Sequence, residues 1–267
     1  MSEPYFSIVT VVRNNLEGLK KTRLSIVEQT NGSWEWIIVD GCSDDGTSEF
    51  AATCAEVNVL LIREPDLGVY DAMNKGLTRS SGQYVIFMNS GDSFASPDVL
   101  FSVQEELTKA PIDVLFGASI LRFGVMDVLR PSRNPGYIWH GQPGTHQATL
   151  FSRTKHLLYP YDLNYKICGD YDVITRMWAA GMTFSSTQIL ISVNEYSARG
   201  ISGRRKLALI EEAVRAQRSN LRLPLWKIAI SVAIRIVTSV SAKTLTLLEF
   251  SGSSPDRKGN AAAKAKA

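Results

Sequence analysis

Strand and helix signals alternate along the first third of the chain, and this alternation limits the folds that it can adopt. Short apolar, often β-branched runs typical of buried strands lie at Ser7–Val12, Trp36–Val39, Val59–Ile62 and Tyr84–Met88. Stretches with helical spacing lie between them, at Leu16–Gln29, Glu49–Glu56 and Val69–Leu77. A strand–helix–strand repeat of this kind predicts a parallel, Rossmann-like sheet flanked by helices.

The second half of the chain is less regular. A helix at Pro97–Lys109 precedes two strands that a three-residue turn joins as a hairpin, Val114–Leu121 and Val125–Leu129. The Pro- and Gly-rich stretch Pro131–Thr145 indicates a loop placed to cover a site. Later strands are expected at Ala148–Phe151 and Thr183–Val193, and helices at Asp170–Ala180 and Gly203–Leu221. The sheet is therefore expected to be mixed rather than purely parallel.

Composition narrows the class of protein. A hydrophobic content of 45% with 21% charged residues is usual for a globular protein, and 267 residues can build a substantial core. The net charge of +3 gives no argument for a nucleic-acid partner. Cys42, Cys54 and Cys168 show neither metal-ligand spacing nor a disulfide framework. Without a secretory signal or a long uninterrupted apolar run, the chain is expected to be cytoplasmic.

The C-terminal part has a distinct charge pattern. From Ala213 to Leu248 there is no acidic residue, and six are basic. Pro224 begins a helix whose polar stripe lies on an otherwise apolar rod, through Lys227, Ser231, Arg235 and Thr238. Residues 215–248 fit the anionic inner face of the plasma membrane, or else a helix packed on the preceding domain or in a dimer. The expected organisation is a domain over 1–200, basic amphipathic helices over 201–250 and a disordered tail over 251–267.

Polar residues follow the expected strands at their carboxyl ends, where ligands bind in open α/β sheets. Asp40 ends the second strand, where its carboxylate can accept a hydrogen bond from a base or ribose, or form a turn with Asp44 capping the next helix. Asp92 is a candidate metal ligand, and Asn89 can hold a ribose or phosphate oxygen; helix capping is the alternative for this turn. Arg13, which follows the first strand with Asn14 and Asn15, can meet phosphate or belong to an ordinary polar turn.

Two further groups carry chemistry. The helix that leads to the fourth strand presents an acid, an amide and a cation, Asp71, Asn74 and Lys75. With Asn89 and Asp92, these predict a nucleotide-diphosphate site. Asp170 begins a later helix, where it is either a general base or an N-cap. His146 and Gln147 offer hydrogen bonds to a polar ligand, or are loop residues.

Taken in order, these motifs resemble the family 2 glycosyltransferases, which transfer sugars from nucleotide donors on a GT-A fold. The resemblance runs from the start of the chain to about Val193. It implies a GT-A, Rossmann-like mixed sheet flanked by helices, with a C-terminal helical extension. It also implies roles for individual residues: donor contacts at Thr10, Arg13, Asp40, Asp71, Asn74, Lys75 and Asn89, a metal ligand at Asp92, acceptor or diphosphate contacts at His146 and Gln147, and the catalytic base at Asp170.

The implied activity is an inverting, Mg²⁺- or Mn²⁺-assisted transfer from a UDP- or GDP-linked sugar to a saccharide or lipid-linked acceptor. Two motifs, Gly68–Gly76 and Met88–Asp92, look like the exopolysaccharide branch of colanic-acid type. The sequence departs from the family's motifs at two places. Asn89 and Gly91 replace acids of the usual metal motif, and Gly169 replaces the Glu before the base. The alternative is a non-catalytic nucleotide-sugar binder or membrane scaffold with a degenerate metal site.

Overall fold

The computed structural model describes residues 3–30, 32–54, 58–196 and 206–237. The chain divides into two compact units, residues 1–224 and 225–267. All named strands belong to the first unit. Among the described residues, no helix is both long enough and apolar enough to span a bilayer.

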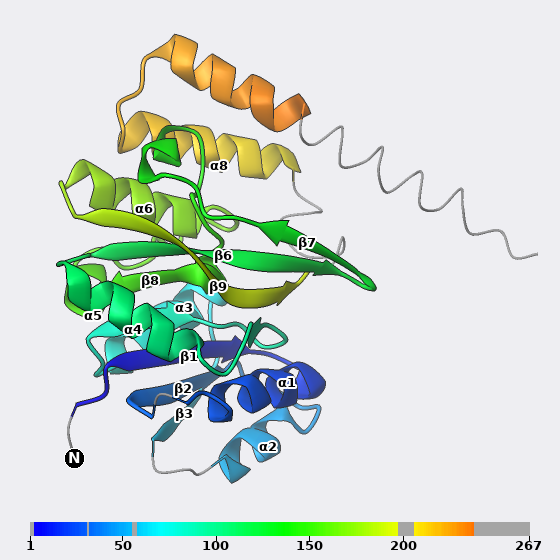
Figure 1. Cartoon of the computed structure of the whole chain (residues 1–267). Coiled ribbons are helices and arrows are strands. Elements are labelled where there is room, and N and C mark those ends of the chain that lie inside the picture. The colour runs from blue at the N-terminus through cyan, green and yellow to red at the C-terminus, as the bar shows by residue number, and fades with distance from the viewer. Residues whose placement is uncertain (1–2, 31, 55–57, 197–205, 238–267) are drawn as a thin grey trace, which may run out of the picture. The chain divides into compact units, whose positions relative to one another are not determined.

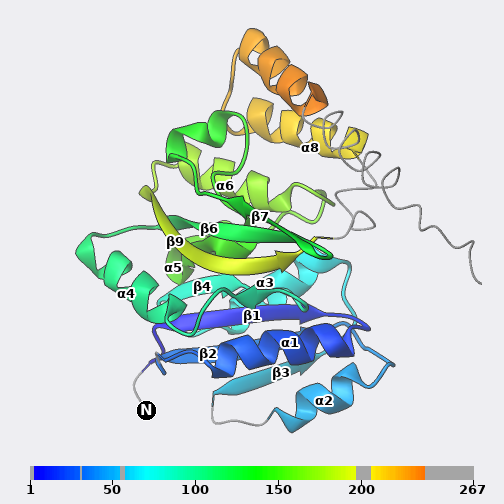
Figure 2. The ribbon, with the colours of Figure 1, turned by 45° about the vertical axis from the view of Figure 1, so that its right-hand side comes forward.

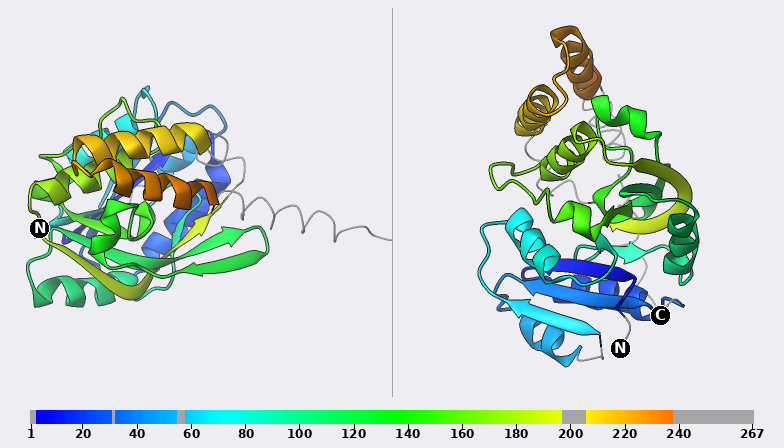
Figure 3. Two further views of the ribbon diagram at one scale, coloured as in Figure 1. Left: turned by 90° about the horizontal axis from the view of Figure 1, so that it is seen from above. Right: turned by 90° about the vertical axis from the view of Figure 1, so that its left-hand side faces the viewer.

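The alternating signals of the first third produce the parallel half of one mixed sheet. The four strands are β1 (Phe6–Val12), β2 (Trp34–Asp40), β3 (Val59–Arg63) and β4 (Tyr84–Phe87). They pair in parallel in the order β3-β2-β1-β4, and Figure 3 (right) shows β1 to β3 side by side. The connecting helices are α1 (Leu16–Val27), α2 (Thr47–Thr53) and α3 (Val69–Arg79). The expected parallel sheet is thus confirmed.

The other half of the sheet is mixed. Beyond β4 the order continues β8-β6-β9-β5, and β7 pairs with β6 as the expected hairpin, which extends away from the sheet in Figure 1. The strands are β5 (Ser93–Phe94), β6 (Val114–Phe123), β7 (Met126–Arg130), β8 (Thr149–Ser152) and β9 (Phe184–Glu195). The remaining helices are α4 (Val99–Lys109), η1 (Pro135–Trp139), η2 (His146–Ala148), α5 (Arg153–His156), α6 (Gly169–Ala179) and α8 (Lys206–Ser219).

Two apolar clusters lie on the two faces of the sheet, because successive strand residues point to opposite sides. Ile8 and Ile38 belong to one cluster with residues of α1 and α4, and both side chains are fully buried. Val9 and Val39 belong to the other, with residues of α3 and α6. Figure 2 shows α1 in front of β1 and β2. The parallel half is therefore a sheet between helical layers, the arrangement expected from the sequence.

Helix α8 lies within the first unit and is held there by polar contacts. The Glu212 carboxylate accepts hydrogen bonds from the backbone N–H groups of Lys166, Ile167 and Cys168 at 2.9, 2.9 and 2.8 Å. Residues 225–237 form a further helix in the second unit. The predicted domain limits at 200 and 250 stay predictions. Residues 238–267, which include the expected tail and the end of the basic segment, lie outside the described residues.

Candidate active site

Three turns meet where parallel strands β1, β2 and β4 end. The backbone N–H of Asn14, after β1, donates to Ser43 Oγ at 2.8 Å, and Asn14 Oδ1 accepts from the N–H of Asp44 at 2.9 Å. Asn15 Nδ2 donates to the carbonyl of Ser90, after β4, at 3.1 Å. These bonds bring the predicted motifs after three separate strands to one edge of the sheet, the place where open α/β sheets bind ligands.

Asp40 ends β2 with a fully buried carboxylate. The carboxylate accepts hydrogen bonds from the N–H of Ser43, at 3.1 Å to Oδ1, and from the hydroxyl of Ser48. Arg63 Nε lies 3.9 Å from Oδ2. The alternative interpretation as a turn-forming acid therefore accounts for both oxygens. Contact between Asp40 and a nucleobase stays a prediction.

Thr10 and Arg13 differ in their access to a ligand. Thr10 is fully buried in β1, and its hydroxyl accepts a hydrogen bond from the Trp36 indole at 2.9 Å. The structure therefore does not bring Thr10 to the site. Arg13 is exposed, and its Cδ lies 3.4 Å from the position that a Cβ on Gly41 would occupy. Its guanidinium is at the strand ends, where a phosphate is expected.

The three polar residues of α3 make contacts within the protein. Lys75 Nζ donates to the carbonyl of Pro65 at 2.6 Å and lies 3.3 Å from Asp71 Oδ2 and 3.2 Å from Glu64 Oε1. Asn74 bonds twice to the backbone of Tyr161: Nδ2 donates to the carbonyl at 2.9 Å, and Oδ1 accepts from the N–H at 2.8 Å. Asn74 thus fastens α3 to the segment before α6, a role that the sequence did not indicate.

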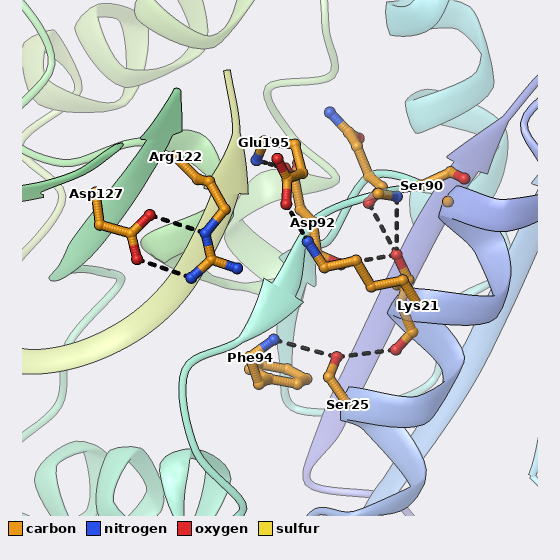
Figure 4. A network of polar contacts seen from close by, with 12 residues as sticks. Lys21, Ser25, Ser90, Asp92, Phe94, Arg122, Asp127 and Glu195 are labelled. Carbon is orange, nitrogen blue, oxygen red and sulfur yellow. Dashed lines mark hydrogen bonds and ion pairs between the residues drawn. The ribbon is translucent and has the colours of Figure 1, made fainter. Parts of the chain in front are cut away.

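The loop after β4 holds Asp92 in a buried position. Gly91 has φ +104°, in the region that favours glycine, and its N–H donates to Thr22 Oγ1 at 3.0 Å. The Asp92 carboxylate accepts from Gln147 Nε2 at 2.7 Å and from the N–H of Glu195 at 3.0 Å. Figure 4 shows Asp92 beside Glu195, whose carboxylate pairs with Lys21. Burial raises the pKa of Asp92, and the Gln147 hydrogen bond opposes that shift.

His146 connects this loop to Asp170. Asn89 Nδ2 lies 2.8 Å from His146 Nε2, and His146 Nδ1 lies 3.5 Å from Asp170 Oδ2. With the Asn89 amide nitrogen facing Nε2, a neutral His146 ring accepts there and carries its proton on Nδ1, toward the carboxylate. Asn89, Asp92, His146, Gln147 and Asp170 are therefore brought together from the β4 loop, η2 and α6, and their roles stay predictions.

Asp170 is a buried acid whose carboxylate can still accept a hydrogen bond. Its side chain is buried at the first turn of α6, and Oδ1 accepts no hydrogen bond of good geometry, although the side chains of Tyr161 and Gln142 lie close to the carboxylate. Burial raises the pKa of Asp170, and His146, Tyr161 and Gln142 lower it part of the way. Asp172, the neighbouring acid, is committed elsewhere, because its carboxylate accepts from Arg176 Nε at 2.8 Å. Of the two acids, only Asp170 has an unsatisfied oxygen.

The sequence comparison decides the family. The sequence model described as Glycosyl transferase family 2 matches residues 7–169. An uncharacterised glycosyltransferase of Mycobacterium tuberculosis is 31% identical over 211 residues, which span 77% of this chain and 79% of that protein. The chain belongs to glycosyltransferase family 2. It therefore transfers a sugar from a nucleotide sugar, and the expected family membership and transferase activity are confirmed.

Solved structures place the chain among GT-A glycosyltransferases, so the expected fold is confirmed. Staphylococcus aureus TarS 1–349, in complex with UDP-GlcNAc, superposes with a TM-score of 0.66 at 14% identity, over 86% of this chain and 71% of that one. A mannosyltransferase from Pyrobaculum calidifontis, in complex with GDP-Man and Mn²⁺, superposes with a TM-score of 0.61 at 16% identity, over 94% of this chain and 80% of that one.

The resemblance implies a Glu at position 169, but a side chain there does not fit in this structure. A Cβ at Gly169 would lie 2.7 Å from the ring carbons of Tyr70. That ring is fixed, because its hydroxyl donates to the carbonyl of Ile167 at 2.7 Å and its face stacks on Tyr161 with centroids 5.1 Å apart. Tyr70 therefore occupies the space that a side chain at position 169 would need, and α6 begins with glycine.

The described acidic side chains supply few ligands for a metal ion by themselves. Among the described residues, no group of three or more His, Cys, Asp or Glu side chains is arranged for a metal ion. Each Asp92 oxygen accepts one hydrogen bond and keeps capacity for another ligand. The buried Oδ1 of Asn89 has no hydrogen-bond partner. These groups fit a Mg²⁺ or Mn²⁺ that takes most of its ligands from a diphosphate and water.

Sequence reasoning missed several residues of this site. Tyr161 lies beside Asp170, Glu195 bonds Asp92 through its backbone N–H, and Asn194 Nδ2 donates to Gln147 Oε1 at 3.3 Å. None stands in a motif. The polar pair Asn194-Glu195, directly after the apolar residues of β9, was the one available signal.

Proposed function

We propose that this family 2 enzyme transfers its sugar with inversion to a saccharide hydroxyl, with Asp170 as the general base. The observation that carries the proposal is the Asp170 carboxylate. It is buried, Oδ1 accepts no hydrogen bond of good geometry, and Oδ2 faces His146, which in turn contacts Asn89 in the β4 loop. A raised pKa suits a group that must accept a proton near neutral pH.

In the proposed reaction, the acceptor hydroxyl gives its proton to Asp170 Oδ1. Its oxygen forms the new glycosidic bond at the anomeric carbon as the bond to the nucleoside diphosphate breaks on the opposite side. His146 stabilises the ionised form of Asp170 before the transfer, because its Nδ1 faces Oδ2. Asn89 holds the His146 ring from the other side. The base and the β4 loop are thereby linked by one side chain.

The donor is proposed to bind at the strand ends as a UDP- or GDP-linked sugar. The two solved relatives in complex with UDP-GlcNAc and with GDP-Man and Mn²⁺ support this class. Asp92 and Asn89 would hold Mg²⁺ or Mn²⁺, which when bound supplies positive charge against the leaving diphosphate. Arg13, Asp40, Asp71 and Lys75 stay as predicted donor contacts. Asn74 is proposed to act instead through Tyr161.

The acceptor is proposed to be a lipid-linked saccharide of exopolysaccharide synthesis, of the type that the colanic-acid resemblance implies. The second unit supports this, because its helix exposes large apolar side chains, including Leu225, Trp226 and Ile230. With the basic residues of the same segment, such a helix fits a peripheral position on an anionic membrane. Arg215 was expected to belong to that surface. Its guanidinium carbon instead lies 3.8 Å from the Tyr165 ring centroid, in the first unit.

The test combines donor binding with transfer. The thermal shift of the purified protein is measured against UDP-, GDP- and dTDP-sugars, with and without Mn²⁺, because a ligand of the folded state raises its stability. A metal-dependent shift for one nucleotide class, lost in Asp92→Ala, is expected. Asp170→Asn should keep that shift and lose transfer by roughly 10²–10⁴-fold. Asp162→Asn, an exposed acid in the loop before α6, is the control and should keep both.

A transfer that needs no metal is the second candidate. One observation favours it: both oxygens of Asp92 already bond within the protein. The thermal shift would then be independent of metal, and the wild type would transfer sugar without Mn²⁺.

A further inference from the structure

Two arginines near Asp170 have no acidic partner. Arg130 ends β7, and Arg133 follows three residues later in the loop before η1. Within the described part of the chain, no carboxylate lies within 4.0 Å of either guanidinium, although other arginines of this protein form such pairs. A guanidinium stays charged in proteins, so burying one without a counter-charge is costly.

Arg130 is the more enclosed of the two. Its side chain is partly buried, whereas Arg133 is exposed, and Arg130 Nη2 donates to the carbonyl of Gln142 at a long 3.4 Å. Burial and the like charge of Arg133 lower the pKa of Arg130, whereas Tyr137 and Tyr196 act in the opposite direction. The two cations therefore act on each other, and no described carboxylate lies within 4.0 Å of either one to offset their repulsion.

The surrounding loop holds this pair in place. Arg133 lies with its guanidinium carbon 4.2 Å from the ring centroid of Tyr137, and its backbone N–H donates to the carbonyl of Pro143 at 2.9 Å. Ser132, between the two arginines, donates through Oγ to the carbonyl of Thr187 at 2.6 Å and accepts from Gln188 Nε2 at 3.0 Å. The arginines therefore sit on a braced segment, which favours a site that exists before its ligand arrives.

The position of the pair indicates which substrate it serves. Gln142 contacts Arg130 through its carbonyl, and its side chain lies close enough to Asp170 to lower the pKa of that carboxyl. Asp170 Oδ2 also faces His146, which contacts Asn89 in the proposed donor loop. In this series of contacts Asp170 stands between the donor loop and the arginines. If the base meets the acceptor hydroxyl, the arginines are on the acceptor side.

We propose that Arg130 and Arg133 form an anion site that binds a phosphate group of the acceptor, beside the base. Two guanidinium groups can each bond two phosphate oxygens. The acceptor class is then a phosphate-bearing saccharide rather than a neutral one. This inference rests on the proposed role of Asp170 and deepens it.

The test uses inorganic pyrophosphate as the probe. The full-length protein is first saturated with the nucleoside diphosphate that gives a thermal shift, so that the donor site is filled, and pyrophosphate is then titrated by calorimetry. Binding to the saturated wild type is expected. Arg130→Gln and Arg133→Gln should each weaken it roughly 10- to 100-fold, because each removes charge-assisted hydrogen bonds. Arg130→Lys, which keeps the charge but not the planar fork, should weaken it less and guards against misfolding of the Gln variant.

The same hairpin offers a matched control. Arg122 bonds Asp127 through Nε and Nη2, both at 2.8 Å, so Arg122→Gln should leave pyrophosphate binding unchanged. Two results would overturn the inference: no pyrophosphate binding by the nucleotide-saturated wild type, or equal binding by wild type and both Arg→Gln variants. Pyrophosphate binding that nucleotide abolishes would assign the arginines to the donor and also overturn it. A transfer-competent Asp170→Asn enzyme that still binds pyrophosphate at the arginines would refute the proposed base instead.

Discussion

At the scale of single residues, burial of Asp170 links the site to the stability of the fold. The folded-state pKa of Asp170 is raised, so folding favours its protonated form. The stability that this group contributes is fully present below its unfolded pKa, about 3.9, and is lost as pH rises through the folded value. Asp170→Asn removes the ionisation. We expect this variant to be more stable than wild type to urea at pH 8, with the difference shrinking toward pH 4. Equal or lower stability at pH 8 would contradict the assignment.

The contact between His146 and Asp170 makes a separate prediction about the pH dependence of the reaction. His146 lowers the pKa of Asp170, so its removal should raise that pKa further. In His146→Gln, the acidic limb of the kcat/KM profile should therefore move to higher pH, while the donor thermal shift is retained. A fall in activity with an unmoved limb would show that His146 contributes only to packing or substrate contact.

Between elements, the double hydrogen bond of Asn74 to Tyr161 fastens α3 to the segment that leads into α6. Asn74→Ala should destabilise the protein by about 1–3 kcal/mol, because buried backbone groups lose their partners. Transfer should fall while the KM for the donor stays unchanged, since the segment carries Tyr161 beside Asp170. Thr78→Ala, one turn further along α3 with an exposed side chain, is the control. A raised donor KM with normal stability would restore the sequence prediction that Asn74 contacts the donor.

The helices and strands of this fold differ in how well the sequence predicts them. Strands β1 to β4 could be predicted because each is an apolar run whose pairing follows from short helical connections. Strand β5, Ser93–Phe94, has too few residues to show a period, and its pairing with Ser192 and Val193 is a distant contact. Elements with a repeating local pattern were therefore found, and those defined by a partner elsewhere were not.

Prediction of the candidate site from the sequence has the same limit. Asn89, Asp92 and Asp170 could be predicted because each follows a recognisable strand or begins a helix. The contact of His146 with both sides could not, because it joins residues 57 and 24 positions apart in sequence. The internal bonds of Asp40 and Asn74 were likewise invisible, since a motif gives a residue's type but not its partner.

Over the whole chain, the division after Pro224 gives the last prediction, that the second unit carries membrane binding. A truncation after Leu223 should keep the nucleotide thermal shift, because the sheet and the site lie in the first unit. It should lose sedimentation with phosphatidylglycerol vesicles, which in the full chain should weaken with salt. Trp226→Glu should reduce sedimentation, whereas Trp178→Glu, an exposed tryptophan of α6, should not. Unchanged sedimentation after truncation would favour a packed or dimer-forming helix, because an apolar face that no lipid covers must find protein instead.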